Sequence, residues 1–150
     1  MPIIQIGLTL YIMRKINFIA LWIIGLLAIL ASCNDTTSID LADNALDGGR
    51  YFLENCNQGD FKKANHYLLD NPENQSYFKG ISNNYFTLDK EGRQQLRQAS
   101  IQINEVQALD SNQTIIKYQS SLDKIPHQLK VVHSPLGWKV DLKYSYGPKL

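Results

Sequence analysis

The stretches that decide the fold are HQLKVV at 127–132 and WKVDLKY at 138–144, separated by SPLG at 134–137. In both stretches, apolar and polar residues alternate with a period of two. That period is typical of a β-strand with one face buried and the other facing solvent. Pro and Gly in the separating segment favour a tight turn. These residues therefore predict two antiparallel strands joined by a hairpin.

Two more strands are predicted just upstream, where IQIN at 101–104 and TIIKY at 114–118 also alternate. Polar turns at 110–113 and 121–124 separate them from each other and from the hairpin. Short connections between consecutive strands favour an antiparallel meander with one apolar face. The second half of the chain is thus predicted to form a four-stranded sheet.

The segment before the sheet has helical periodicity. Apolar residues at 42–56 repeat every three or four positions, and a helix crossing close to another element would explain Gly48 and Gly49. Asp60 is a suitable N-cap for a second helix, which we expect to end at Asn71-Pro72. Residues 74–86 predict a short helix or an ordered loop, and residues 88–99 a third helix. Helices followed by strands predict an α+β fold with the helices on the apolar face.

The leader has the parts of a secretory signal, since Arg14 and Lys15 precede an uncharged segment at 18–31. Apolar residues ahead of that basic pair suggest that translation begins at Met13. A transmembrane helix is the alternative, but residues 16–31 are shorter than the roughly 20 residues that span a bilayer. The leader ends in four residues of the type at which signal peptides are cut: Leu30, Ala31, Ser32 and Cys33.

This tetrapeptide resembles the lipobox of bacterial lipoproteins. The resemblance implies that Cys33 carries a diacylglycerol, becomes the first mature residue and takes a further acyl chain such as palmitate. Two or three chains hold a protein stably on a membrane. We therefore expect a signal peptide at 1–32, a lipidated tether at 33–40, one domain at 41–146 and a tail at 147–150. Because Asn34 and not Asp follows the cysteine, we expect the outer membrane, facing the periplasm.

Three segments of the expected domain resemble nuclear-transport-factor-2-like domains: FLE at 52–54, GDFKKA at 59–64 and GWKVDL at 137–142. The resemblance covers about residues 40–146. It implies a curved antiparallel sheet wrapped around the helices into a cone. Enzymes of that fold place a polar dyad or triad, usually an Asp with a Tyr or His, inside the cone. Small lipid-anchored members have no assigned function.

Alternation places several aromatic side chains on the apolar face of the predicted sheet, where they could line a pocket for a flat apolar ligand. The alternative is that they simply form the core of a small domain. The residues concerned are Tyr118, His127, Trp138 and Tyr144. Asp141 is the obvious strand carboxylate, but alternation puts it on the solvent side with Lys139 and Lys143. We expect it to form a cross-strand ion pair there.

The sequence motifs predict neither a metal site nor a bound cofactor. Its histidines, His66, His127 and His133, lack the spacing of a zinc site, and no phosphate-binding glycine loop occurs. Cys56 would be the single thiol left after lipidation, and its helical position favours a buried small residue over a nucleophile. With 15 basic and 14 acidic residues, the nearly balanced charge gives no basic field for nucleic acid.

These observations favour a non-catalytic, lipid-anchored envelope module whose partners are the membrane and either an envelope protein or a small apolar ligand. The alternative is an isomerase- or dehydratase-like enzyme in which Asp141, Tyr118 or His127 moves a proton. It requires Asp141 to be buried within hydrogen-bond reach of Tyr118 or His127. A third interpretation is an interaction module whose strand edge extends a partner's sheet.

Overall fold

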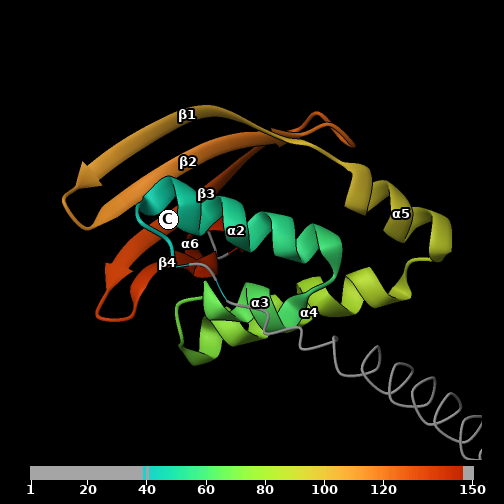
Figure 1. Ribbon diagram of the computed structural model, residues 1–150, viewed down its shortest axis with the longest axis horizontal. Coiled ribbons are helices and arrows are strands. Elements are labelled where there is room, and N and C mark those ends of the chain that lie inside the picture. The colour runs from blue at the N-terminus through green and yellow to red at the C-terminus, as the bar shows by residue number, and fades with distance from the viewer. Residues whose placement is uncertain (1–38, 40, 147–150) are drawn as a thin grey trace, which may run out of the picture. The chain divides into compact units, whose positions relative to one another are not determined.

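Helices followed by a four-stranded sheet form the part of the chain that the computed structural model describes, which is residue 39 and residues 41–146 (Figure 1). These residues belong to one compact unit, Ile39–Leu150. The expected signal peptide, the lipobox with Cys33, the tether up to Ser38 and the tail at 147–150 lie outside the described residues.

The predicted antiparallel meander is confirmed, with the strands in the order β1-β2-β3-β4. The sheet is strongly curved but open, since β1 and β4 pair with only one strand each (Figure 1). Two register shifts interrupt the pairing of β1, one after Ile103 and one after Ala108. The strand bounds are β1 Ile101–Asp110, β2 Gln113–Ser120, β3 Pro126–Ser134 and β4 Gly137–Asp141.

The predicted α+β class is also confirmed, because in the described part of the chain four helices precede the sheet and a short one follows it. The side chain of an Asn or Asp caps each of the first four by accepting a backbone N–H, which satisfies a donor that the helix leaves free. No helix among the described residues is long and apolar enough to cross a membrane. The bounds are α2 Ala45–Gln58, α3 Phe61–His66, α4 Pro72–Thr87, α5 Lys90–Gln98 and α6 Leu142–Tyr146.

The second helix ends earlier than predicted, and Asn71-Pro72 begins a helix instead of ending one. Asn71 Oδ1 accepts the backbone N–H of Asn74 at 2.8 Å, and Pro72 occupies the first turn of the 16-residue helix α4. α3 stops at His66 because the next residues pair with the edge of β4. The backbone N–H of Leu69 donates to the carbonyl of Val140 at 2.9 Å.

The last strand is shorter than predicted, since β4 ends at Asp141 and residues 142–146 form α6. The cause is the buried side chain of Asn74, which donates to the carbonyl of Leu69 at 3.0 Å and accepts the backbone N–H of Lys143 at 2.9 Å. This second bond takes up a backbone group that a longer strand would use. A contact 69 residues away in the chain therefore sets where the strand ends.

The two glycines in α2 allow it to cross close to the sheet, as predicted. A Cβ atom at Gly49 would lie 2.6 Å from Ile116 Cδ1, and one at Gly48 would lie 3.1 Å from Trp138 Cβ. Both distances are shorter than ordinary van der Waals contact. α2 consequently lies directly on β2, β3 and β4.

The core forms between α2 and the inner face of the sheet. Phe52 of α2 contacts a layer of strand residues that register places on one face, including Ile116, Leu129 and Val131. Burying each such side chain contributes roughly 1.5–3 kcal/mol. The largest fully buried side chains are Phe52, Ile116, Leu129, Leu142, Val131, Val140 and Asn74.

Candidate functional site

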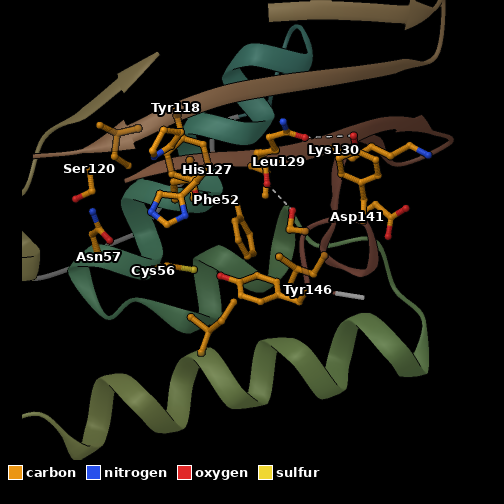
Figure 2. A pocket seen from close by; sticks show the side chains of 18 of the residues that line it. Phe52, Cys56, Asn57, Tyr118, Ser120, His127, Leu129, Lys130, Asp141 and Tyr146 are labelled. Carbon is orange, nitrogen blue, oxygen red and sulfur yellow. Dashed lines mark hydrogen bonds between the residues drawn. The ribbon is translucent and has the colours of Figure 1, made fainter. Parts of the chain in front are cut away.

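A cavity of about 990 Å³ lies beneath the curved sheet, beside the second half of α2 and against α6 (Figure 2). Its size is within the range of pockets that bind small molecules. Helices α4 and α5 contribute Ile81 and Leu96 to the wall. Much of the lining is apolar and includes Phe52, Leu53, Ile81, Leu96, Leu129 and Leu142.

Tyr118 and His127 form a cross-strand pair that lines this cavity. They are register partners on β2 and β3, and their rings stack with centroids 5.3 Å apart and planes at 27°. His127 Nε2 lies 3.0 Å from Asp123 Oδ2 in the turn between the strands. The backbone N–H of Ile125, followed by His127, holds the pKa of Asp123 below its usual range. Asp123 is therefore an ionised partner for the imidazole.

A thiol and two phenols gather in one part of the cavity. Figure 2 shows the phenol of Tyr146 directed toward Cys56, close to Tyr118 and His127. Burial raises the pKa of the Cys56 thiol to about 12. It also raises the pKa of Tyr118, with smaller effects of Tyr146, Cys56 and Asp123, and the pKa of Tyr146. The thiol and the two phenols therefore keep their protons at neutral pH.

Two charged lining residues, Lys130 and Asp141, lie apart from this thiol and phenol region (Figure 2), and Lys143 also lines the cavity. Asp141 lines the cavity and is half-buried, which corrects the prediction that it faces solvent on the outer side. It also lacks the predicted ion pair. Lys143 bonds to Glu73 at 2.7 Å instead, and this hydrogen bond raises the pKa of Lys143.

The alternative of an isomerase- or dehydratase-like enzyme required Asp141 to lie within hydrogen-bond reach of Tyr118 or His127. Within residues 39 and 41–146, the carboxylate that contacts His127 belongs to Asp123, and Asp141 makes no such bond. Asp123 and His127 are each more than one-third exposed, at 39% and 38% of their side chains. The pair lies at the rim, where water reaches both groups.

Of the four aromatic residues predicted to line a pocket, the structure brings three together. Tyr118, His127 and Tyr144 line the cavity, and Tyr144 donates its hydroxyl to Gln128 Oε1 at 3.3 Å. Trp138 is not among the residues that line this cavity, so the prediction is wrong for it. It is on β4 and shares the inner face, but it pairs with His133 at the other end of β3. There it packs against Gly48 and, at 4.9 Å between ring centroids, against His133.

Lys139 was predicted to face solvent, and this prediction is wrong: the residue is buried, with only 6% of its surface exposed. The segment that follows α3 covers this edge of β4, and Lys139 Nζ donates to the carbonyl of His66. Burial lowers the pKa of Lys139, and burial followed by the charge of Lys139 lowers the pKa of His66. Both groups belong to the fold and are absent from the cavity lining.

Several lining residues were not predicted as site residues. Phe52, Cys56 and Asn57 come from the second half of α2; the spacing of the first two indicated only a core face, and Asn57 was predicted to lie in a break after the helix. Tyr146 was missed because the last strand was predicted to run to Tyr144 and no helix was expected after it. The helical spacing of Phe52 and Cys56, combined with the strand alternation of Tyr118, was the available signal that these side chains meet.

The arrangement is suited to holding an apolar molecule against a few polar groups. Among the described residues, no three His, Cys, Asp or Glu side chains are grouped in a way that could hold a metal ion. No protein-family model matches the chain, and a comparison with curated proteins gives no significant match. The geometry of the cavity is therefore the basis for a functional proposal.

Proposed function

We propose that this protein is a lipid-anchored lipoprotein of the bacterial cell envelope, and that its α+β domain binds a small apolar ligand without chemical turnover. The observation that carries the binding proposal is the cavity of about 990 Å³, whose wall combines apolar side chains such as Phe52, Leu53 and Leu129 with polar ones. Apolar walls with a few placed polar groups are typical of small-molecule sites. The lipobox at 30–33 supports the anchor.

We also propose that the domain is nuclear-transport-factor-2-like, with an open form of the cone. The order of elements supports this, because helices precede a curved antiparallel meander. The sequence GDFKKA at 59–64 caps and begins α3, at the place where the resemblance puts a second helix. The proposed location is the outer membrane, facing the periplasm, with membrane lipid as the partner of the anchor.

The binding proposal is tested with the uncharged fluorophore N-phenyl-1-naphthylamine, whose emission rises in apolar surroundings. Ile81 of α4 lines the cavity, so Ile81→Trp should fill part of it and weaken probe binding at least fivefold. Val106→Trp is the control, because Val106 is exposed on β1 and outside the lining. Equal binding by wild type and both variants, with unchanged melting temperatures, would rule the cavity out as the site.

The anchor is tested by growing cells with an alkyne-bearing fatty acid and attaching a reporter to the purified protein. Wild type should carry the label and Cys33→Ala should not. An unlabelled wild type would contradict the anchor while leaving the binding proposal intact.

A further inference from the structure

Two phenol hydroxyls in the cavity are available to a ligand. Tyr118 Oη and Tyr146 Oη make no hydrogen bond within the described part of the chain, and no side-chain polar atom there is both fully buried and unpaired. Both side chains line the cavity, and Tyr146 is also 56% exposed, so water or a ligand can approach the two hydroxyls. By contrast, the hydroxyl of Tyr144 already bonds to Gln128. The lining thus contains two uncommitted phenols and one committed phenol.

The thiol beside these two hydroxyls is neutral, since burial raises the pKa of Cys56, next to Tyr146, to about 12. The charge that acts on Tyr118 is negative, that of the Asp123 carboxylate, which lies 3.0 Å from His127 Nε2. Lys130 and Asp141 lie at the other end of the lining (Figure 2). A ligand that placed a carboxylate beside the phenols would therefore meet the negative charge of Asp123. Of the lysines in the described lining, Lys130 is at the other end and Lys143 is paired with Glu73.

We infer that the cavity selects an uncharged apolar molecule bearing a hydrogen-bond acceptor oxygen, such as an ester, and that Tyr118 and Tyr146 donate to that oxygen. This inference rests on the proposed binding function and adds the ligand class to it. Phe52, Leu53 and Leu129 surround the apolar body of the ligand. An acceptor is required because a phenol that loses water to a ligand without an acceptor forfeits a hydrogen bond.

The test uses three ligands of nearly equal shape: methyl 2-naphthoate, 2-propylnaphthalene and 2-naphthoate. The first has a neutral acceptor, the second has none, and the third is an anion. Binding to the purified full-length lipoprotein in detergent is followed by ligand-observed NMR titration. The wild type should bind the ester about 3- to 10-fold more tightly than the hydrocarbon, the range expected for one or two neutral hydrogen bonds.

Tyr118→Phe and Tyr146→Phe remove only a hydroxyl, and each should reduce the preference for the ester, with the double variant abolishing it. Tyr144→Phe is the matched control and should leave the preference unchanged, because that hydroxyl is already bonded to Gln128. A preference that persists in the double variant would overturn the inference, as would tightest binding of 2-naphthoate.

The outcomes also separate this inference from the function on which it rests. If ester and hydrocarbon bind equally well to the wild type, the cavity binds apolar ligands but the phenols do not select among them. If none of the three binds, both the inference and the proposed binding function are contradicted.

Discussion

The inner face of the sheet has two ends that are built alike and packed differently. Each carries a cross-strand pair of a histidine and a larger aromatic residue: His133 with Trp138 at 4.9 Å, and His127 with Tyr118 at 5.3 Å. At the first end, here called the closed end, α2 touches the sheet through Gly48. At the second, the open end, α2 presents Cys56 to a cavity.

The difference follows from the side chains of a single helix. Glycine at 48 and 49 lets the start of α2 approach the strands to within contact of Trp138 and Ile116. One to two turns later, Phe52 fills the space between helix and sheet, and beyond it the curved strands diverge from the helix axis (Figure 1). The same helix thus packs closely on the sheet near its start and supplies one wall of the cavity in its second half. Three experiments test this contrast.

The largest expected effect is at the closed end. Gly49→Val places new atoms within 2.6 Å of Ile116 Cδ1 and 3.4 Å of Val131 Cγ2, so it should lower the free energy of unfolding by about 2–3 kcal/mol. Gly80→Val is the control, since a Cβ there meets nothing within 4 Å, and its effect should stay within about 0.5 kcal/mol. Urea denaturation followed by circular dichroism measures both. Equal effects of the two changes would mean that α2 does not lie close to the sheet.

An intermediate effect is expected where α6 closes the open end. Asn74→Leu leaves the carbonyl of Leu69 and the N–H of Lys143 unpaired, which should cost about 2 kcal/mol of stability. Because Lys143 N begins α6, probe binding should also weaken through displacement of Tyr146. Asn83→Leu, on the exposed side of α4, serves as the control for both readouts. Loss of stability without loss of binding would show that Asn74 does not position the cavity wall.

The smallest effect is a loss of stability in alkali that originates at the open end. The folded pKa of Cys56, about 12, lies above its ordinary value of 9.0, so unfolding releases a proton between these values. The stabilisation is complete below pH 9 and decreases above it, by at most about 1.4 kcal/mol per pH unit for one group. Urea midpoints of wild type should fall from pH 8.5 to 9.5, a loss of under about 1 kcal/mol, and those of Cys56→Leu should fall less. Parallel curves for the two proteins would contradict the buried thiol.

Local pattern was sufficient for much of the fold, because the relevant interactions are short in range. Alternation at 114–118 and 127–132 marked the strands and their shared face, and Asp60 marked the start of α3. α4 was harder to predict, since its buried residues are Asn74, Phe78 and Tyr85, of which one is polar. Its helical state depends on the cap at Asn71 and on packing against α6, which periodicity does not record.

The cavity was only partly predictable. Alternation placed Tyr118 and His127 on the correct face, but it placed Trp138 there as well and could not show that the two groups lie at opposite ends. Asp141 was assigned to solvent because alternation placed it on the same side of the strand as Lys139 and Lys143. In the fold, Lys139 turns to the carbonyl of His66 and Lys143 to Glu73, and neither partner is close in sequence.

By itself, the amino-acid sequence determined the α+β order of elements, the meander and the helix cap at Asp60, because each depends on residues within a few positions of one another. The lipid anchor at Cys33 remains a prediction from the same kind of local pattern. Only the tertiary structure decided where β4 ends, which lysine is buried and where the cavity lies. Those features depend on contacts such as Asn74 with Lys143, whose partners are distant in the chain and meet only when helices pack on the sheet.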